Sequence, residues 1–395
     1  MGEWKNVRVG ELGKIITGKT PKTSISDNYG GRIPFLTPSD NMSVKYVGKT
    51  SKTLTEKGLL EVKNAILPEN SVCVSCIGSD LGKAVITTCP TVTNQQINSI
   101  IVDKKSFDVS FVYYAMQILG KKMNFISKTS TAVPIVNKSS FSSYEIKCPP
   151  REDQKRIAAV LSALDSKIEC NKKINDNLEQ QAVTYFQELY INNANPMWQI
   201  GTISDLGTVV GGSTPSKTKP EYYTNNGIAW ITPKDLSINK SKFISHGEND
   251  ITELGLKNSS ATVMPKGTVL FSSRAPIGYI AIASNEVTTN QGFKSVIPYL
   301  EIGTAFVYFF LKHSLPVIES AASGSTFKEI SGSAMKNIPA IIPDRSTLDQ
   351  FNSFCAPIFA QQKNLEDQNY SLAMLRDSLL PKLMSGAIDI ASIQL

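Results

Sequence analysis

The 395-residue sequence contains two copies of one pattern, and a chain of this kind folds into two similar units. Corresponding positions follow the same order in both copies, at a separation that stays between 194 and 197 residues. The corresponding segments are Trp4 with Trp198, Gly18-Lys-Thr-Pro21 with Gly212-Ser-Thr-Pro215, Ile33-Pro-Phe-Leu-Thr-Pro-Ser-Asp40 with Ile228-Ala-Trp-Ile-Thr-Pro-Lys-Asp235, Asn94-Gln95 with Asn290-Gln291, and Phe111-Val-Tyr-Tyr114 with Phe306-Val-Tyr-Phe309. So many collinear matches indicate duplication rather than chance.

Each copy begins with about 150 residues that are rich in Gly, Pro, Thr and Ser. Short apolar runs such as Val72-Cys-Val74 and Val269-Leu-Phe271 lie between turn residues, which is typical of short strands joined by turns. Residues 111–121 and 304–312 have helical character. We therefore predict mixed α/β or α+β globular domains.

Each copy ends in a long predicted helix. After Pro150, apolar residues recur at steps of four and three to residue 191, with polar interruptions at Asn171 and Asn175. The same stepping follows Pro343 and stops near Gly386, although Pro357 should kink or restart this second helix. The apolar seam is predicted to contain Ile157, Leu161, Leu164, Ile168, Leu178, Phe351, Ile358, Leu365, Leu372 and Leu379.

A helix with one narrow apolar stripe does not bury that stripe alone, so the two helices are expected to pack together. We predict an antiparallel pair with a similar globular domain at each end, related by a pseudo-two-fold axis. In the alternative arrangement, each helix packs only on its own globular domain. The predicted boundaries are 1–148 for the first globular domain, 149–191 for a central helical region, 192–342 for the second globular domain, 343–386 for a C-terminal helical region and 387–395 for a tail.

The composition of the chain argues against several classes of protein and of catalytic site. The net charge of +7 is compatible with a nucleic-acid partner without requiring one. No apolar stretch approaches the roughly 18 residues of a membrane helix, and the N-terminus lacks a signal-peptide pattern. The six dispersed cysteines are expected to be free thiols in the cytoplasm. With only two histidines, the chain is a poor candidate for a His-rich zinc site or a Ser-His or Cys-His nucleophile.

A moderately basic molecule with two similar domains on a spacer suits a bipartite target such as DNA with two half-sites. Corresponding loops over residues 17–24 and 211–219 combine lysines, hydroxyl groups and glycines, which suits phosphate oxygens, although solvated turns also explain them. Two further pairs of loops, 77–83 with 274–279 and 127–132 with 323–328, are equally ambiguous. The phosphate-type candidates are Lys19, Thr20, Lys22, Lys83, Lys128, Thr131, Lys217, Lys219, Lys234, Thr326 and Lys328.

Base-reading candidates differ between the copies. Arg274 can hold guanine O6 and N7 with two hydrogen bonds, whereas Ile77 stands at the corresponding position of the first copy. This difference is expected if the two domains read different sequences. Asn94, Gln95, Asn290 and Gln291 suit adenine edges, but such residues are equally often turn residues with satisfied hydrogen bonds.

Four motifs together resemble the specificity subunit of Type I restriction-modification enzymes, and their order and duplication extend the resemblance over the whole chain. They are Gly-x-Thr-Pro, Trp-Ile-Thr-Pro-Lys-Asp, Asn-Gln-Gly and the closing Leu379-Leu-Pro-Lys-Leu-Met-Ser-Gly386. The resemblance implies a non-catalytic subunit with two target-recognition domains. Its implied partners are double-stranded DNA with a bipartite site, two methyltransferase subunits and restriction-translocase subunits. S-adenosylmethionine, ATP and magnesium are then expected on the partner subunits, with no cofactor or metal in this chain.

The alternative is a self-contained DNA-modifying enzyme, such as a metal-dependent nuclease. Asp40 followed by Glu61-Val-Lys63 has suitable residue types, but the second copy lacks them. Cys73 and Cys76 have zinc or redox spacing, yet no second ligand pair accompanies them, so a half-buried strand is the preferred interpretation. The sequence also lacks a Walker motif and an Asn/Asp-Pro-Pro-Tyr/Phe methyltransferase motif.

Overall fold

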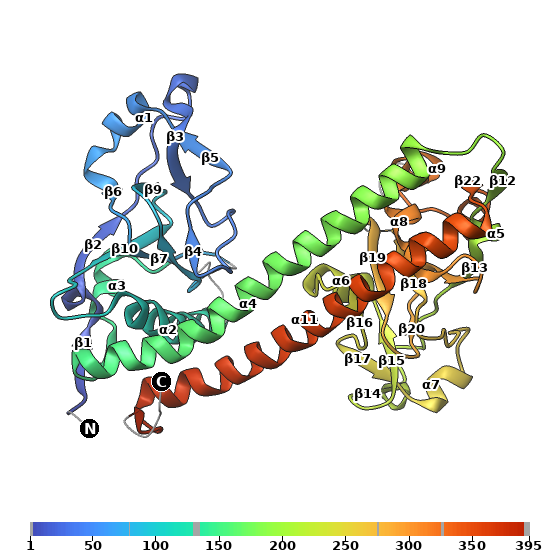
Figure 1. Ribbon diagram of the computed structural model, residues 1–395. Helices are drawn as coiled ribbons and strands as arrows, with labels where there is room; N and C mark the ends of the chain where they lie inside the picture. The colour runs from blue at the N-terminus through green and yellow to red at the C-terminus, as the bar shows by residue number, and fades with distance from the viewer. Residues whose placement is uncertain (1–2, 79, 129–134, 275, 325–327, 391–395) are drawn as a thin grey trace. The chain divides into compact units, whose positions relative to one another are not determined.

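The computed structural model describes residues 3–390 except 79, 129–134, 275 and 325–327. The chain divides into two compact units, and each is a mixed α+β structure. Unit 1 comprises Met1–Glu169 and Tyr370–Leu395, and unit 2 comprises Cys170–Asn369. The predicted fold class is confirmed, because each unit combines small β-sheets with segments of two long helices (Figure 1).

The described residues of unit 1 form three sheets. Strands β1 and β11 form a two-stranded sheet, a five-stranded sheet has the order β2-β10-β7-β8-β4, and a four-stranded sheet has the order β5-β3-β9-β6. Their bounds are β1 Lys5–Arg8, β2 Gly13–Thr17, β3 Tyr29–Leu36, β4 Tyr46–Val47, β5 Lys52–Leu54, β6 Ile66–Leu67, β7 Ser71–Ser75, β8 Ala84–Thr87, β9 Thr91–Thr93, β10 Ile97–Val102 and β11 Glu145–Cys148.

Unit 2 repeats this topology, as the sequence duplication requires. Its sheets have the orders β12-β22, β13-β21-β18-β19-β16 and β14-β17-β15-β20. In both units the edge strand of the five-stranded sheet, β4 or β16, is parallel to its neighbour. The bounds are β12 Gln199–Thr202, β13 Gly207–Gly211, β14 Tyr223–Thr224, β15 Ile228–Ile231, β16 Phe243–Ile244, β17 Asn249–Ile251, β18 Val269–Ser273, β19 Ile277–Ala283, β20 Thr288–Thr289, β21 Lys294–Pro298 and β22 Pro339–Ile342.

Strand β7 lies between two apolar cores, which corrects the prediction of a half-buried strand. All five of its residues are buried. Val72 and Val74 belong to the core under helix α2, whereas Cys73 faces a second core that includes residues of the four-stranded sheet. Alternate side chains of a strand point to opposite faces, so a strand covered on both faces is apolar throughout.

Short helices complete each unit. Residues 111–121 and 304–312 are helical, as predicted. They belong to α2, which lies against β7 and β8, and to α8, which lies against β18 and β19 (Figure 1). The bounds are α1 Glu56–Glu61, α2 Val109–Lys128, α3 Lys138–Ser143, α5 Ile203–Leu206, α6 Pro233–Ile238, α7 Glu253–Lys257, α8 Thr304–His313, α9 Leu315–Ala321 and α10 Gly332–Lys336, with single turns η1 Val9–Glu11, η2 Ser26–Asn28, η3 Lys63–Ala65 and η5 Pro220–Tyr222.

The two long helices are α4, Arg151–Phe186, and α11, Arg345–Ser385. A π-helical segment, η4 Gln187–Asn192, follows α4. Helix α11 runs through Pro357 without interruption, so the predicted restart at this residue is wrong. Pro357 is exposed, and the apolar contacts of Cys355 and Ile358 on the buried face hold the helix together around it. The helix ends where Gly386 takes a positive φ of 77°.

The apolar seam packs on the core of each unit as well as on the opposite helix. In unit 1, Ile157 and Leu161 of α4 share a core with Leu380 and Leu383 of α11 and with residues of α2. In unit 2, Phe351 and Ile358 of α11 are buried with residues of α8, and Leu178 of α4 packs against them. Of the other seam positions, Ile168 and Leu365 are buried, and Leu164, Leu372 and Leu379 are half-buried.

Polar contacts fix the pairing of α4 with α11 in unit 2. The buried Asn171 amide donates to Gln368 Oε1 at 3.3 Å and to Asn369 Oδ1 at 3.0 Å. The Gln362 amide donates to the Asn175 carbonyl at 3.1 Å. Because residue numbers rise on α4 as they fall on α11, the two segments are antiparallel, as predicted.

Candidate nucleic-acid interface

In unit 1 the Gly-x-Thr-Pro loop lies directly on the Asn-Gln turn. The Thr20 hydroxyl donates to Gln95 Oε1 at 2.6 Å, and the Lys19 amide donates to the Thr93 carbonyl at 2.8 Å. Gly18 is required by this contact, since a Cβ there would lie 2.1 Å from the Asn94 carbonyl oxygen. Two segments that are 75 residues apart therefore form one surface.

Unit 2 repeats the contact with its own residues. The Thr214 hydroxyl donates to Gln291 Oε1, and the Ser213 amide donates to the Thr289 carbonyl at 2.9 Å. A Cβ on Gly212 would lie 2.0 Å from the Asn290 carbonyl oxygen. The glycine and threonine of the motif thus have the same structural role in both copies.

A tyrosine fixes the far side of each loop. The Tyr29 hydroxyl donates to the Pro21 carbonyl at 2.9 Å, and the Tyr223 hydroxyl donates to the Pro215 carbonyl at 2.6 Å. Burial raises the pKa of both tyrosines, which keeps the phenol protonated as a donor. These residues were not among the predicted candidates, although their match at positions 29 and 223 was visible in the sequence.

Two more segments join the surface through backbone hydrogen bonds. In unit 1 the Cys76 amide donates to the Gln96 carbonyl at 2.8 Å, and the Val136 amide donates to the Cys76 carbonyl at 2.9 Å. In unit 2 the corresponding bonds run from Ser273 to Gly292 at 2.8 Å and from Ile330 to Ser273 at 3.0 Å. We call these four linked segments the loop cluster of each unit.

The side chains of Asn94 and Asn290 shape the turn. Asn94 Oδ1 accepts from the Gln96 amide at 3.1 Å, and Asn290 Oδ1 accepts from the Gly292 amide at 2.9 Å. Gln95 and Gln291 are exposed, so their amide nitrogens face solvent as possible donors. Within the predicted Asn-Gln pairs, the glutamines are therefore better placed for a ligand than the asparagines.

The predicted basic residues differ in their surroundings. Lys19, Lys22 and Lys217 are exposed on the loops. Four others form ion pairs with nearby carboxylates, and Lys328 is exposed beside Glu329. These pairs are Lys83 with Asp80 at 2.6 Å, Lys219 with Glu221 at 3.9 Å, Lys234 with Glu248 at 2.5 Å, and Arg274 with Glu329 at 3.4 Å. Thr131, Thr326 and the side chain of Lys128 lie outside the described residues.

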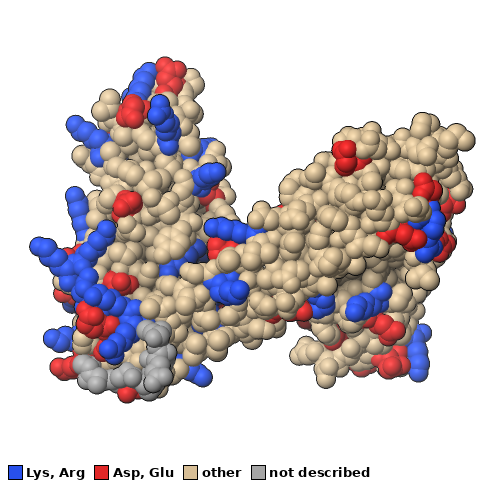
Figure 2. Space-filling view, in the orientation of Figure 1, with Lys and Arg blue, Asp and Glu red and all other residues tan. Residues whose placement is uncertain are grey.

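Basic and acidic side chains are distributed differently on the two units. On the face shown in Figure 2, unit 1 carries many lysine and arginine side chains interspersed with acidic ones, whereas the charged side chains visible on unit 2 lie mainly along its edges. No single strongly basic patch dominates this face. The loop geometry therefore locates the candidate interface better than the charge does.

The sequence analysis missed two lysines of corresponding position, the half-buried Lys45 and the buried Lys242. Lys45 precedes β4, and its ammonium donates to Ser162 Oγ of α4 at 2.6 Å and to the Tyr114 hydroxyl at 3.2 Å. Burial lowers the pKa of Lys45 to about 8, even though the nearby Asp165 acts in the opposite direction. The Tyr114 hydroxyl in turn donates to Asp165 at 2.5 Å.

Lys242 precedes β16 and makes the corresponding anchor in unit 2. Its ammonium pairs with Glu179 of α4 and donates to Gln362 Oε1 of α11 at 2.6 Å. Lys242 is only 7% exposed, and burial lowers its pKa despite the Glu179 charge. Both lysines therefore attach an edge strand of the five-stranded sheet to the long helices. Their similar surroundings are visible only in three dimensions.

The nuclease-like residues have structural partners. The Asp40 carboxylate accepts from the Thr37 amide at 2.8 Å and from the Ser51 amide at 2.7 Å. Glu61 accepts from the Lys22 amide at 2.9 Å. Among the described residues, no group of three or more His, Cys, Asp or Glu is arranged to hold a metal ion. Burial raises the pKa of Cys73 to about 12, so this thiol is unreactive at neutral pH.

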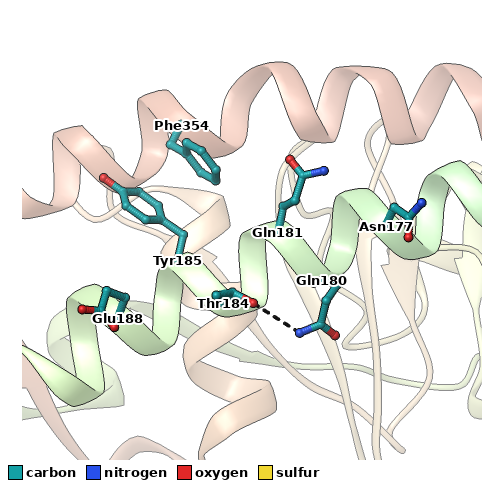
Figure 3. A pocket seen from close by; sticks show the side chains of 7 residues that line it. All are labelled: Asn177, Gln180, Gln181, Thr184, Tyr185, Glu188 and Phe354. Carbon is teal, nitrogen blue, oxygen red and sulfur yellow. Dashed lines mark hydrogen bonds between the residues drawn. The ribbon is translucent and has the colours of Figure 1, made fainter.

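A groove of about 780 Å³ opens on the long helices within unit 2 (Figure 3). Its lining mixes amides with the partly exposed rings of Tyr185 and Phe354, whose centroids are 4.3 Å apart. The lining residues are Asn177, Gln180, Gln181, Thr184, Tyr185, Glu188 and Phe354. In the part of the chain that is described, no helix is both long and apolar enough to cross a membrane.

Comparison with known proteins identifies the family. The model of the Type I restriction modification DNA specificity domain matches residues 1–180 and 195–366. The specificity subunit of the HindI enzyme of Haemophilus influenzae is 22% identical over 98% of this chain and 100% of that protein. The MjaIX specificity subunit of Methanocaldococcus jannaschii is 43% identical, but the match spans 40% of this chain and 37% of that protein.

A solved structure has the same fold. The Type I restriction-modification S subunit of M. genitalium superposes with a TM-score of 0.58 and 17% identity, over 97% of this chain and 96% of that one. The family model occurs twice, in the same order as the two copies read from the sequence. The chain therefore belongs to the Type I restriction-modification specificity subunits, the non-catalytic DNA-recognition components of these enzymes.

Proposed function

We propose that each unit reads one half of a bipartite sequence in double-stranded DNA through its loop cluster. The repeated contact between Thr20 and Gln95, and between Thr214 and Gln291, is the observation that carries this proposal. It places exposed amides and lysines together on a rigid β framework in both units. Phosphate contacts from the lysines then position the duplex, and side chains around the Asn-Gln turn read base edges.

The long helices are proposed to set the gap between the two half-sites. Helix α4 has 36 residues, and at 1.5 Å per residue it is about 54 Å long. This length exceeds one turn of DNA, which is roughly 34–36 Å. A gap of several base pairs between the half-sites is therefore expected.

The outer faces of these helices are proposed to bind two methyltransferase subunits, with restriction-translocase subunits joining for cleavage. The groove around Tyr185 and Phe354 supports this, because aromatic residues are enriched at protein interfaces and both rings are partly exposed. S-adenosylmethionine, ATP and magnesium would then be bound by those partners, and the complex would act in the cytoplasm.

The reading of DNA is tested by selecting sequences from a random duplex library with the purified full chain. We expect two short sequences separated by a fixed gap. Lys217→Ala should weaken all sequences about equally and lower the salt slope by about one. Selection of one continuous sequence, or of no sequence at all, would contradict the proposal.

The docking of the methyltransferase is tested separately. Gln181→Arg places a charge in the groove, and Gln187→Arg places the same charge at an exposed position outside its lining. Co-purification of a co-expressed Type I methyltransferase subunit should be lost only for Gln181→Arg. Equal retention of the partner by both variants would show that the groove is not the interface.

A further inference from the structure

The two loop clusters differ in chemistry at one corresponding place. In unit 1, Ile77 and Ile135 form an isolated antiparallel bridge, and in unit 2, Arg274 and Glu329 form one. Each bridge directly follows the backbone bond that ties its segment to the Asn-Gln turn. The equivalence of Ile135 with Glu329 is set by the fold, because no sequence motif links these two residues.

A third pair of corresponding residues, Asn98 in unit 1 and Lys294 in unit 2, also differs in charge. Asn98 lies opposite Thr17 in the β10–β2 pair, and Lys294 lies opposite Gly211 in the β21–β13 pair. The side-chain Nδ2 of Asn98 donates to the Val136 carbonyl at 3.2 Å, and its Oδ1 accepts from the Thr17 hydroxyl at 2.7 Å. Asn98 therefore holds the 135–136 segment in place without adding charge.

The unit 2 positions form a small charged group. Glu329 lies between two cations, with Oε2 3.4 Å from Arg274 Nη1 and Oε1 3.8 Å from Lys294 Nζ. The Arg274 and Glu329 side chains are 37% and 38% exposed, whereas that of Lys294 is 16% exposed. Arg274 and Glu329 are the more exposed pair, so they can exchange their ion pair for contacts with a ligand.

The unit 1 positions present an apolar surface instead. The Ile135 side chain is 68% exposed and is therefore accessible to a ligand. Its neighbour across the bridge, Ile77, is half-buried. Among base edges in the major groove, only thymine offers a methyl group to such a side chain.

We propose that these positions determine base specificity, with Arg274 and Glu329 reading a G·C pair and Ile135 reading a thymine methyl group. This inference rests on the proposed reading of one half-site by each unit. The Arg274 fork suits guanine O6 and N7, and a carboxylate near phosphates is unfavourable unless it accepts a hydrogen bond from a base amino group. Cytosine N4 supplies that group in the same base pair.

The test exchanges the chemistry between the units. The double variant Ile77→Arg with Ile135→Glu introduces the charged pair into unit 1. The double variant Arg274→Ile with Glu329→Ile introduces the apolar pair into unit 2. Each full-length double variant is used to select sequences from a random duplex library. We expect one base pair to change in each case, to G·C in the first half-site and to T·A in the second, with the other half-site unchanged.

Conservative variants keep the test decisive if an exchanged pair does not fold. Arg274→Lys retains the charge but loses the fork, so the preference for guanine at one position should fall roughly tenfold or more while other positions stay unchanged. Glu329→Gln should relax the preference for cytosine at the same base pair. The control is Arg345→Gln with Asp349→Asn, which removes an exposed ion pair of α11 outside the loop cluster and should change no base preference.

The outcomes separate the two levels of the proposal. If the unchanged chain selects no bipartite sequence, the proposed function itself is wrong. If the unchanged chain selects one but Arg274→Lys and Glu329→Gln keep every base preference, only the specificity assignment is overturned. Changes spread over both half-sites would overturn the assignment as well.

Discussion

Gly18 and Gly212 show how one residue decides the geometry of each loop cluster. Each lies so close to a carbonyl of the Asn-Gln turn that a Cβ would approach to about 2 Å, whereas Gly211 has open space around its Cβ position. Of the two adjacent glycines in unit 2, Gly212 has no room for a Cβ atom, whereas Gly211 has room for one. This contrast isolates steric contact from the general flexibility of glycine.

Gly212→Ala should separate the loop from the turn and reduce affinity for the second half-site by at least about tenfold, since misplacing contacts by an ångström weakens several hydrogen bonds together. Gly211→Ala should leave affinity unchanged. Binding to duplexes with either half-site altered measures both effects. Equal loss in the two variants would mean that the loop needs flexibility rather than close contact.

Lys45 gives unit 1 a pH-dependent stability. Its pKa of about 8 lies below the ordinary 10.5, so between these values the unfolded chain binds more protons than the folded one. Stability through this group therefore rises with pH across that window. From pH 7.5 to 9.5 the free energy of unfolding should increase by about 2 kcal/mol relative to a Lys45→Met variant.

Urea unfolding of the wild type and Lys45→Met at the two pH values measures this difference. The variant supplies the control, because all other titrating groups are shared. A constant difference between the two proteins across the window would show that Lys45 stays charged in the folded state.

At the scale of elements, Pro357 lies inside the continuous helix α11 on its exposed side. Proline lacks the amide hydrogen for the helical bond to residue 353 and its ring crowds the preceding turn. Packing of the neighbouring Cys355 and Ile358 in the core of unit 2 offsets this penalty. Local propensity predicted a kink or a restart at Pro357, and the restart does not occur because tertiary packing keeps the helix continuous.

Pro357→Ala should stabilise the protein by about 1–3 kcal/mol, visible as a higher urea midpoint. Pro220→Ala is the matched control, since Pro220 begins the short η5 turn, where its fixed φ is favourable and its removal should give no gain. Destabilisation by Pro357→Ala would instead indicate that the ring itself makes a needed contact.

At the scale of the whole molecule, the proposal that α4 and α11 set the gap between the two half-sites can be tested. The test uses the antiparallel contacts between these two helices. Asn171 lies level with Gln368, and Asn175 lies level with Gln362. Insertions of seven residues after Lys173 and after Glu366 would leave both sets of contacts intact. One heptad also keeps the apolar seam in register.

This double insertion lengthens the helices by about 10 Å, so the preferred gap should grow by about three base pairs with both half-sequences unchanged. Some loss of affinity for DNA is also expected, because a longer gap rotates one half-site around the duplex relative to the other. Selection on duplexes that differ only in gap length measures the optimum. An unchanged optimum in a folded variant would show that the helices do not set the gap.

The sequence by itself determined the duplication, the mixed α+β class and the two long helices, because each leaves a local pattern of glycine, proline or apolar spacing. It also marked the Gly-x-Thr-Pro loop and the Asn-Gln turn, but not the segments at Cys76 and Val136 that complete the loop cluster. It also marked Thr20 and Gln95 as candidates without relating them. The fold decided that they touch, that Lys45 and Lys242 attach edge strands to the helices, and that Ile135 corresponds to Glu329. Each of these contacts joins residues that are far apart in the chain. The chemistry of single residues and the local periodicity of the sequence carry no information about such long-range contacts.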